Sequence, residues 1–158
     1  RTLHDYQAVR SSIPHGILCI SLYLVTSQAI TSSENWGILM KVALVISQLQ
    51  LPFILGGDWQ NTPDSLRCST FLSYITGSIV SPNVGTCRSS ATGALQIIDF
   101  FVVSDCLVQA GAVKSCYTVL HANISPHRPV VLELVARPRA KNIAILRAVP
   151  QTDSDWPG

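Results

Sequence analysis

The sequence predicts a mixed α/β domain in which sheets pack against helices. In residues 16–76, apolar runs with the character of strands alternate with two segments that carry helix signals. In residues 78–135, only short strand-like runs follow. Hydrophobic residues make up 47% of the 158 residues and charged residues only 13%, which indicates a chain with a large buried interior.

The first strand and the first helix are expected in residues 16–50. Residues 16–23 form an apolar run typical of a buried strand. Residues 31–34, Thr-Ser-Ser-Glu, match a capping box in which the Thr31 hydroxyl accepts from the backbone at Glu34. The helix is expected from about Ser32 to Gln50, because Pro52 disfavours helical geometry at the residue before it.

A second strand and a second helix follow. Residues 52–57 read as a strand that ends in two glycines and Asp58. Thr62 supplies a hydroxyl cap, Pro63 suits the first helical turn, and Asp64 suits the positive end of a helix. This helix is expected to end near Thr76.

The remaining elements are expected to be strands. Gly, Pro, Asn or Ser bounds each of four short apolar runs, at residues 78–80, 96–104, 112–119 and 129–135. The pattern decays after residue 136. We therefore expect one domain in residues 1–136 and a basic, partly flexible tail in residues 137–158.

Composition excludes some classes and leaves others open. A net charge of +2 permits a polyanionic partner without requiring one. No apolar stretch reaches the roughly 18–20 residues of a membrane-spanning helix. The five cysteines show no C-x-x-C spacing, so we expect buried free thiols, which favour a cytoplasmic or nuclear location.

Three segments place polar residues where apolar strands end or begin. They are residues 56–60 with Asp58 and Gln60, residues 97–101 with Asp99, and residues 125–130 with His127. A carboxylate at the end of a strand is where α/β enzymes commonly place their chemistry. Asp99 interrupts an apolar run, and because an unpaired buried charge is costly, His127 is a natural partner for it.

These segments resemble the late motifs of the endonuclease/exonuclease/phosphatase family, which consists of metal-dependent phosphodiesterases with a DNase I-like fold. The family motifs are Gly-Asp-x-Asn, Ile-Asp-Tyr/Phe and Ser-Asp-His-x-Pro-Val. Their counterparts here are centred on Asp58, Asp99 and His127, in the same order, with gaps of 41 and 28 residues. Tyr23, at the end of the first strand, resembles the family's active-site tyrosine, and residues 86–88 resemble the segment that leads into the second motif.

The resemblance implies a partial α/β sandwich and hydrolysis of a phosphate ester, most often in nucleic acid, with Mg²⁺ or Mn²⁺. Asp58 would orient or deprotonate the attacking water and contact the metal. His127 would stabilise phosphoryl charge, and Asp99 would orient its imidazole. Tyr23 would hydrogen-bond the phosphate or assist the leaving group.

The sequence also departs from the family pattern. Gln60 stands where the family has Asn, unless Asn61 takes that role, and Pro126 stands where the family has Asp. The family's metal-binding Glu lies upstream of the tyrosine strand, whereas both glutamates here follow Tyr23. The resemblance therefore covers the C-terminal portion of the family domain, and the rest is expected in a longer parent chain.

Simpler interpretations of the same residues stay open. Asp58 can be a turn residue, Asp99 a structural acid, His127 a surface residue and Tyr23 a residue at the rim of the core. The alternative to a hydrolase is a catalytically degenerate member or fragment that binds a phosphate-bearing ligand or a protein.

Overall fold

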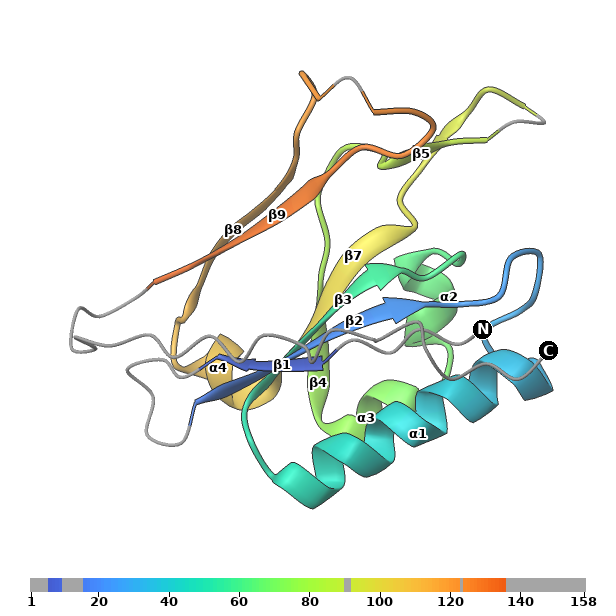
Figure 1. Ribbon diagram of the computed structural model, residues 1–158. Coiled ribbons are helices and arrows are strands. Elements are labelled where there is room, and N and C mark those ends of the chain that lie inside the picture. The colour runs from blue at the N-terminus through green and yellow to red at the C-terminus, as the bar shows by residue number, and fades with distance from the viewer. Residues whose placement is uncertain (1–5, 10–15, 90–91, 123, 136–158) are drawn as a thin grey trace, which may run out of the picture.

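The computed structural model describes residues 6–9, 16–89, 92–122 and 124–135 (Figure 1). Strands dominate, and one long helix crosses the molecule. In chain order the elements are β1 (Tyr6–Val9), β2 (Ile17–Tyr23), α1 (Ser33–Leu49), β3 (Phe53–Asp58), α2 (Pro63–Arg67), α3 (Phe71–Ile75), β4 (Gly77–Val80), β5 (Cys87–Arg88), β6 (Leu95–Gln96), β7 (Asp99–Ser104), α4 (Asp105–Gln109), β8 (Val113–Thr118) and β9 (Val130–Leu134).

The main sheet has five strands in the order β1-β2-β3-β7-β4. Strands β2 and β3 are parallel, as a strand–helix–strand unit requires, and the other neighbours are antiparallel. Two smaller antiparallel pairs, β5-β6 and β8-β9, complete the described strands. The predicted mixed α/β class is confirmed.

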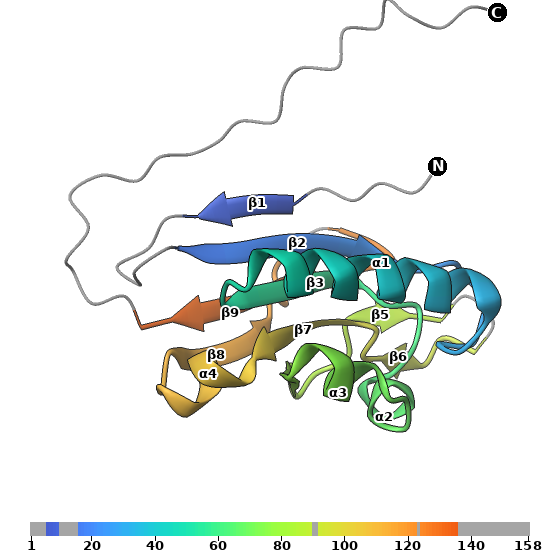
Figure 2. The same ribbon diagram turned by 90° about the horizontal axis from the view of Figure 1, so that it is seen from below.

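The two faces of the main sheet pack against different layers. Side chains alternate between faces along a strand, so Leu55 and Val102 point to one face while Ile54 and Val103 point to the other. On the first face they join the buried stripe of α1, which consists of Ile38, Leu39, Val42 and Ile46. On the second face, Leu132 and Leu134 of β9 pack near Val103. Figure 2 shows α1 lying along the sheet as the outer layer of this partial sandwich.

Both predicted helices form, with two corrections. The cap of α1 is Ser32 and not Thr31, because the Ser32 side chain accepts from the backbone of Asn35 at 3.3 Å. The helix expected from Thr62 to Thr76 is broken into α2 and α3. Between them, the Ser69 hydroxyl donates to the carbonyl of Leu66 at 2.7 Å, a local bond that competes with helical pairing. The Thr62 cap is confirmed by its bond from the Ser65 backbone at 3.4 Å.

Most of the predicted strands form, but one of them is interrupted. Residues 96–104 do not form one strand, because β6 ends at Gln96 and β7 begins at Asp99. The short elements β1, β5 and α4 were not predicted. The five cysteines are free, as expected. Cys68 and Cys106 are exposed and the other three are only partly buried, so the expectation of buried thiols was wrong. Residues 137–158, the predicted tail, lie outside the described residues.

Among the residues that the structure describes, no helix combines the length and the hydropathy needed to cross a bilayer.

Candidate active site

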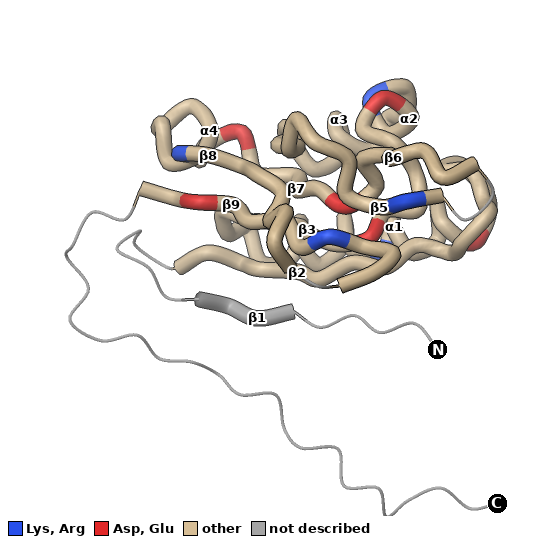
Figure 3. The backbone as a smooth tube through the Cα atoms, turned by 90° about the horizontal axis from the view of Figure 1, so that it is seen from above, with Lys and Arg blue, Asp and Glu red and all other residues tan. Residues whose placement is uncertain are grey.

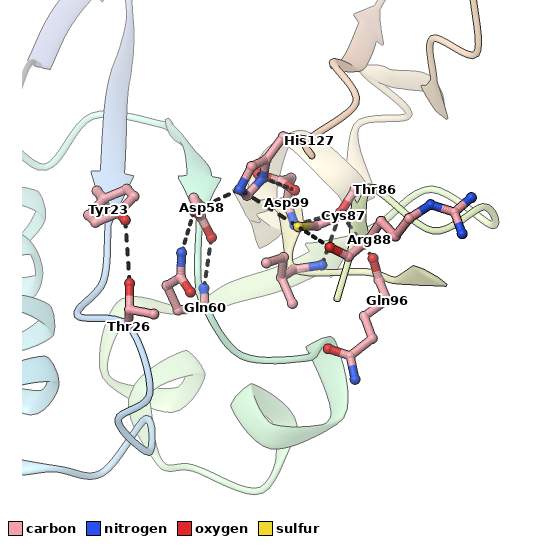
Figure 4. Close-up of polar contacts among 11 residues, drawn as sticks. Tyr23, Thr26, Asp58, Gln60, Thr86, Cys87, Arg88, Gln96, Asp99 and His127 are labelled. Atoms are coloured by element: carbon pink, nitrogen blue, oxygen red, sulfur yellow. Dashed lines mark hydrogen bonds and ion pairs between the residues drawn. The ribbon is translucent and has the colours of Figure 1, made fainter. Parts of the chain in front are cut away.

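Two acidic residues meet at one edge of the main sheet. Asp58 is the last residue of β3, Asp99 is the first residue of β7, and the antiparallel register places them directly opposite each other. Tyr23 ends β2 and lies opposite Asp58 on its other side. The sheet register therefore brings three of the predicted residues to adjacent positions (Figure 4).

His127 reaches this edge through pairing with β5. The backbone of Arg88 donates to the Pro126 carbonyl at 3.1 Å, and the backbone of Arg128 donates to the Thr86 carbonyl at 2.6 Å. These bonds frame an antiparallel bridge between Cys87 and His127. The bridge fixes the backbone that carries His127 beside the start of β7, although 28 residues separate His127 from Asp99.

The His127 imidazole lies between the two carboxylates. Its Nδ1 is 3.1 and 3.2 Å from the two oxygens of Asp99, so the Nδ1–H donates to that carboxylate. Its Nε2 lies 3.7 Å from Asp58 Oδ2. Because Nδ1 is bound to Asp99, Nε2 is the ring nitrogen that faces the space beside Asp58.

Asp58 is held by Gln60. The Gln60 backbone donates to Asp58 Oδ1 at 3.0 Å, and the Gln60 side-chain amide donates to Oδ2. Burial raises the pKa of the Asp58 carboxyl, the Gln60 backbone bond opposes that rise, Asp99 adds to it, and His127 and the Gln60 side chain oppose it. The side chain of Asp58 is 12% exposed, so it is desolvated but still reachable.

Tyr23 and Asn61 do not join the cluster. The Tyr23 hydroxyl lies 3.5 Å from Thr26 Oγ1, and the residue is 56% exposed. No hydrogen bond links it to the described side chains of Asp58, Asp99 or His127. The Asn61 amide donates to the carbonyls of Gln28 and Trp59, so Asn61 serves the loop rather than standing in for a site asparagine.

The cluster can receive a cation. Three donor atoms lie within 4.8 Å of one another, one from each of Asp58, Asp99 and His127. The same three residues line an open hollow of about 300 Å³. Both glutamates lie elsewhere. Glu34 contacts Ser33 in the first turn of α1, and Glu133 pairs with Lys114 on the β8-β9 pair.

Sequence inspection gave no role to Thr86, although its segment was noted. Thr86 is fully buried, and its hydroxyl accepts from the backbones of Ile98 and Asp99, both at 3.0 Å. Trp59 was also missed. It stacks on Phe100 at 4.9 Å and donates from Nε1 to the Phe100 carbonyl at 3.0 Å, which joins the segment after Asp58 to β7. Asp99 could be recognised in the sequence because it is a charged residue within an apolar run. Thr86 has no comparable signal, because its burial depends on the fold.

Solved structures share this arrangement of elements. The endonuclease domain of TRAS1, a telomere-specific non-LTR retrotransposon, is 13% identical with a TM-score of 0.63, covering 88% of this chain and 70% of that one. Cytolethal distending toxin from Actinobacillus actinomycetemcomitans is 15% identical with a TM-score of 0.55, covering 85% and 60%. The fold is DNase I-like.

The DNase I-like fold is present in part. CdtB, the biologically active subunit of cytolethal distending toxin, is 15% identical with a TM-score of 0.52, and the match covers 74% of this chain but 47% of CdtB. The chain thus spans about half the length of that structure. No family model and no curated protein matches the sequence.

Proposed function

We propose that this chain belongs to the endonuclease/exonuclease/phosphatase family and contributes to metal-dependent hydrolysis of phosphodiester bonds. One observation carries the proposal. Two carboxylates and an imidazole, from segments 41 and 28 residues apart, converge at one sheet edge of a DNase I-like fold. Acid–base chemistry with an assisting cation needs groups of these types in this proximity.

The residues present fit a hard divalent cation. Mg²⁺ is commonly held by one or two carboxylates, with waters and substrate phosphate filling the remaining positions. Asp58 would be the main ligand, and Asp99 is the nearest second carboxylate. A bound Mg²⁺ or Mn²⁺ would neutralise charge that develops on the phosphoryl group.

Asp58 is the group that would accept a proton from the attacking water. It must be ionised for this, and both Gln60 bonds favour the ionised form. Gln60 thus acts as a positioning residue through Asp58, although its side chain is one methylene longer than the asparagine of the family motif.

His127 would stabilise charge on the phosphoryl oxygens, and Asp99 would keep its ring in the required tautomer and orientation. Tyr23 would act on the substrate and not within the cluster. Its exposed hydroxyl, at the same sheet edge, is free to contact a phosphate or a leaving group when substrate binds.

Nucleic acid is the substrate class that we propose. The similarity to the TRAS1 endonuclease domain supports it, and Arg128 beside His127 lines the hollow at the cluster. Basic residues in the described chain appear as separate stretches in Figure 3, with one of them at β5. A short contact with a few phosphates fits this distribution better than a long groove.

The test is metal-dependent turnover. Bis-p-nitrophenyl phosphate, nicked DNA and abasic DNA would be incubated with the chain and Mg²⁺ or Mn²⁺, with chelator as the blank. Asp58→Ala and His127→Ala should abolish turnover, whereas Asp64→Ala, an exposed acid paired with Arg67, should retain it. Turnover that survives both site substitutions would contradict the proposal.

A second function is favoured by two observations. Neither glutamate of the chain contributes to the cluster, and Pro126 precedes His127 where the family pattern has an acid. A catalytically degenerate member that binds a phosphate-bearing ligand or a protein would retain Asp58 and His127 without turnover. Binding of a nonhydrolysable phosphodiester to a folded but inactive chain would support it, and a rise in activity in Pro126→Asp would show that the motif has decayed at that position.

A further inference from the structure

The hollow at the cluster has two chemically different sides. Eight of its lining residues divide into a polar and an apolar group. The polar group is Asp58, Asp99, His127 and Arg128, and the apolar group is Phe101, Ile124, Pro129 and Val130. A phosphate and a cation at the cluster would use the polar side alone. The apolar side has no role in the hydrolysis proposed above.

Ile124 is the most exposed member of the apolar group. The residue is 58% exposed, whereas Phe101, Pro129 and Val130 are half-buried. Within the part of the chain that the structure describes, Ile124 belongs to neither hydrophobic cluster of the core. A single exposed isoleucine on a surface needs no explanation. Ile124 differs because it lines the same hollow as the two carboxylates and the imidazole.

The backbone near Ile124 is anchored. Two residues further on, the Pro126 carbonyl accepts from the Arg88 backbone at 3.1 Å. The Val119 backbone donates to the Pro129 carbonyl at 2.8 Å, which ties together the ends of the connection between β8 and β9. Ile124 is therefore carried by a connection that the β5 bridge and the β8-β9 pair hold beside the cluster.

Phe101 supplies a second apolar side chain in a fixed position. It lies opposite Gly56 in the register of β3 and β7, on the same face of the sheet as Asp99. Its ring covers Gly56, where a Cβ would come within 2.6 Å of Phe101 Cε1. Close packing on a glycine therefore holds an aromatic ring directly behind the carboxylates.

A phosphodiester of nucleic acid carries both kinds of group that this hollow suits. The phosphate is anionic and suits Arg128, whereas the sugar C–H groups and the faces of the base are apolar. Removing these apolar groups from water against an aliphatic side chain is favourable. An alkyl chain is the competing occupant. An exposed side chain such as Ile124 can cover one face of a flat base, but an alkyl chain gains most where apolar groups enclose it.

We infer that Ile124 is a specificity-determining residue that contacts the sugar and base beside the scissile phosphate, with Phe101 as the second apolar side chain of the hollow. The contact favours nucleoside phosphodiesters over phosphate diesters with small alkyl groups. Binding energy from this non-reacting part of the substrate appears in kcat/KM. The preference in turnover rests on the proposed function, whereas the contact itself also predicts a preference in binding.

The activity test compares three esters with the same leaving group. The p-nitrophenyl ester of thymidine monophosphate carries a sugar and a base, methyl p-nitrophenyl phosphate carries neither, and hexyl p-nitrophenyl phosphate carries an alkyl chain. Ile124→Ser should lower kcat/KM for the thymidine ester by about 5-fold or more, and for the methyl ester by less than about 2-fold. Ile124→Leu keeps the apolar surface and should retain the preference.

Leu120→Ser is the matched control, because Leu120 is 55% exposed on the same connection and is not among the residues that line the hollow. It should leave the turnover of all three esters unaffected. Equal losses for the thymidine and methyl esters in Ile124→Ser would show that Ile124 supports the cluster and not the nucleoside. An equal loss for the hexyl ester would show a general apolar contact. Either result, or no loss at all, would overturn the inference.

A binding test separates the inference from the proposed function. Thymidine monophosphate and methyl phosphate would each be titrated into the chain with Mg²⁺ and followed by calorimetry. The parent chain should bind thymidine monophosphate at least about 5-fold more tightly, and Ile124→Ser should lose that difference. Such a preference in a chain without turnover would refute the hydrolysis and keep the contact. Turnover without any preference among the esters would refute the contact and keep the hydrolysis, and equal or absent binding of both compounds would also overturn the contact.

Discussion

The buried hydroxyl of Thr86 accepts a hydrogen bond from the backbone of Asp99 at 3.0 Å and thereby fixes where β7 begins. The same oxygen accepts from the Ile98 backbone at 3.0 Å. These bonds interrupt the strand that the apolar run predicts, because a side chain takes the two N–H groups that would otherwise seek a neighbouring strand. Asp99 consequently stands at the open end of β7.

Thr86→Val should therefore damage both stability and site. The substitution keeps the shape of the side chain and removes its oxygen, which should cost about 2 kcal/mol or more in the free energy of unfolding. Urea denaturation would measure this, and turnover should fall as Asp99 loses its position. The matched control is Thr118→Val, another buried threonine whose hydroxyl donates to the Val84 carbonyl away from the cluster. Equal losses of turnover in both variants would count against the positioning role.

Gln60→Ala should shift the pH dependence of turnover. The Gln60 side-chain bond lowers the pKa of Asp58, so its removal should raise that pKa. If ionised Asp58 is required, the acidic limb of the pH–rate profile should move to higher pH, and activity near the limb should fall. Asn61→Ala, which removes only loop contacts, should leave the limb where it is. An unmoved limb in Gln60→Ala would separate Gln60 from Asp58 ionisation.

Asp58 should also weaken the fold as pH rises. Burial is the largest cause of the raised Asp58 pKa, which lies above the ordinary value of 3.8. The folded state therefore holds the carboxyl proton of Asp58 more tightly than the unfolded state does. The associated stability is fully present below pH 3.8 and is lost as pH rises through the folded pKa. Asp58→Asn cannot ionise and should avoid that loss.

Thermal unfolding in chelator would test this across about pH 3–8. The melting temperature of Asp58→Asn relative to the parent should rise with pH and level off a few degrees higher. Asp64→Asn is the control, because Asp64 is exposed and paired with Arg67. A flat difference for Asp58→Asn across this range would show that the Asp58 pKa is not raised.

The strands and the acidic site residues could be predicted from the sequence, because both depend on local signals. Strand ends were marked by glycine, proline and polar residues, and Asp99 was conspicuous as a charge in an apolar run. The sheet register then brought Asp58 and Asp99 opposite each other. Their predicted roles in catalysis remain proposals.

What the sequence could not give depends on contacts between distant residues. Strand β5, whose Cys87 forms a bridge with His127, consists of only Cys87 and Arg88. Two residues are too few to show a periodic pattern in the sequence. The cap of α1 was misassigned by one residue because Thr31, Ser32 and Ser33 are all suitable caps. Ser32 was selected by Asn35, which is fully buried and binds the carbonyls of Gln28 and Ala29 in the preceding loop.

Gly57 should be the least replaceable glycine near the site. Its φ is 156°, and a Cβ there would collide with the Leu22 carbonyl on the neighbouring strand β2. The absence of a side chain thus lets β2 and β3 approach just before Asp58. Gly57→Ala should lower the free energy of unfolding by at least about 2 kcal/mol, since backbone must move.

Gly37→Ala provides the opposite control for the same measurement. Gly37 lies inside α1, and apart from its chain neighbours and the backbone of the helix itself no described atom lies within 4 Å of the position that an alanine methyl would take. Alanine should therefore stabilise the helix by about 0.5–1 kcal/mol. Urea denaturation of both variants should give shifts of opposite sign. If Gly57→Ala were as stable as the parent, β2 and β3 could separate at low cost. Asp58 would then not be held at a fixed distance from Tyr23, and the sheet edge would be a less rigid platform for the site than its register implies.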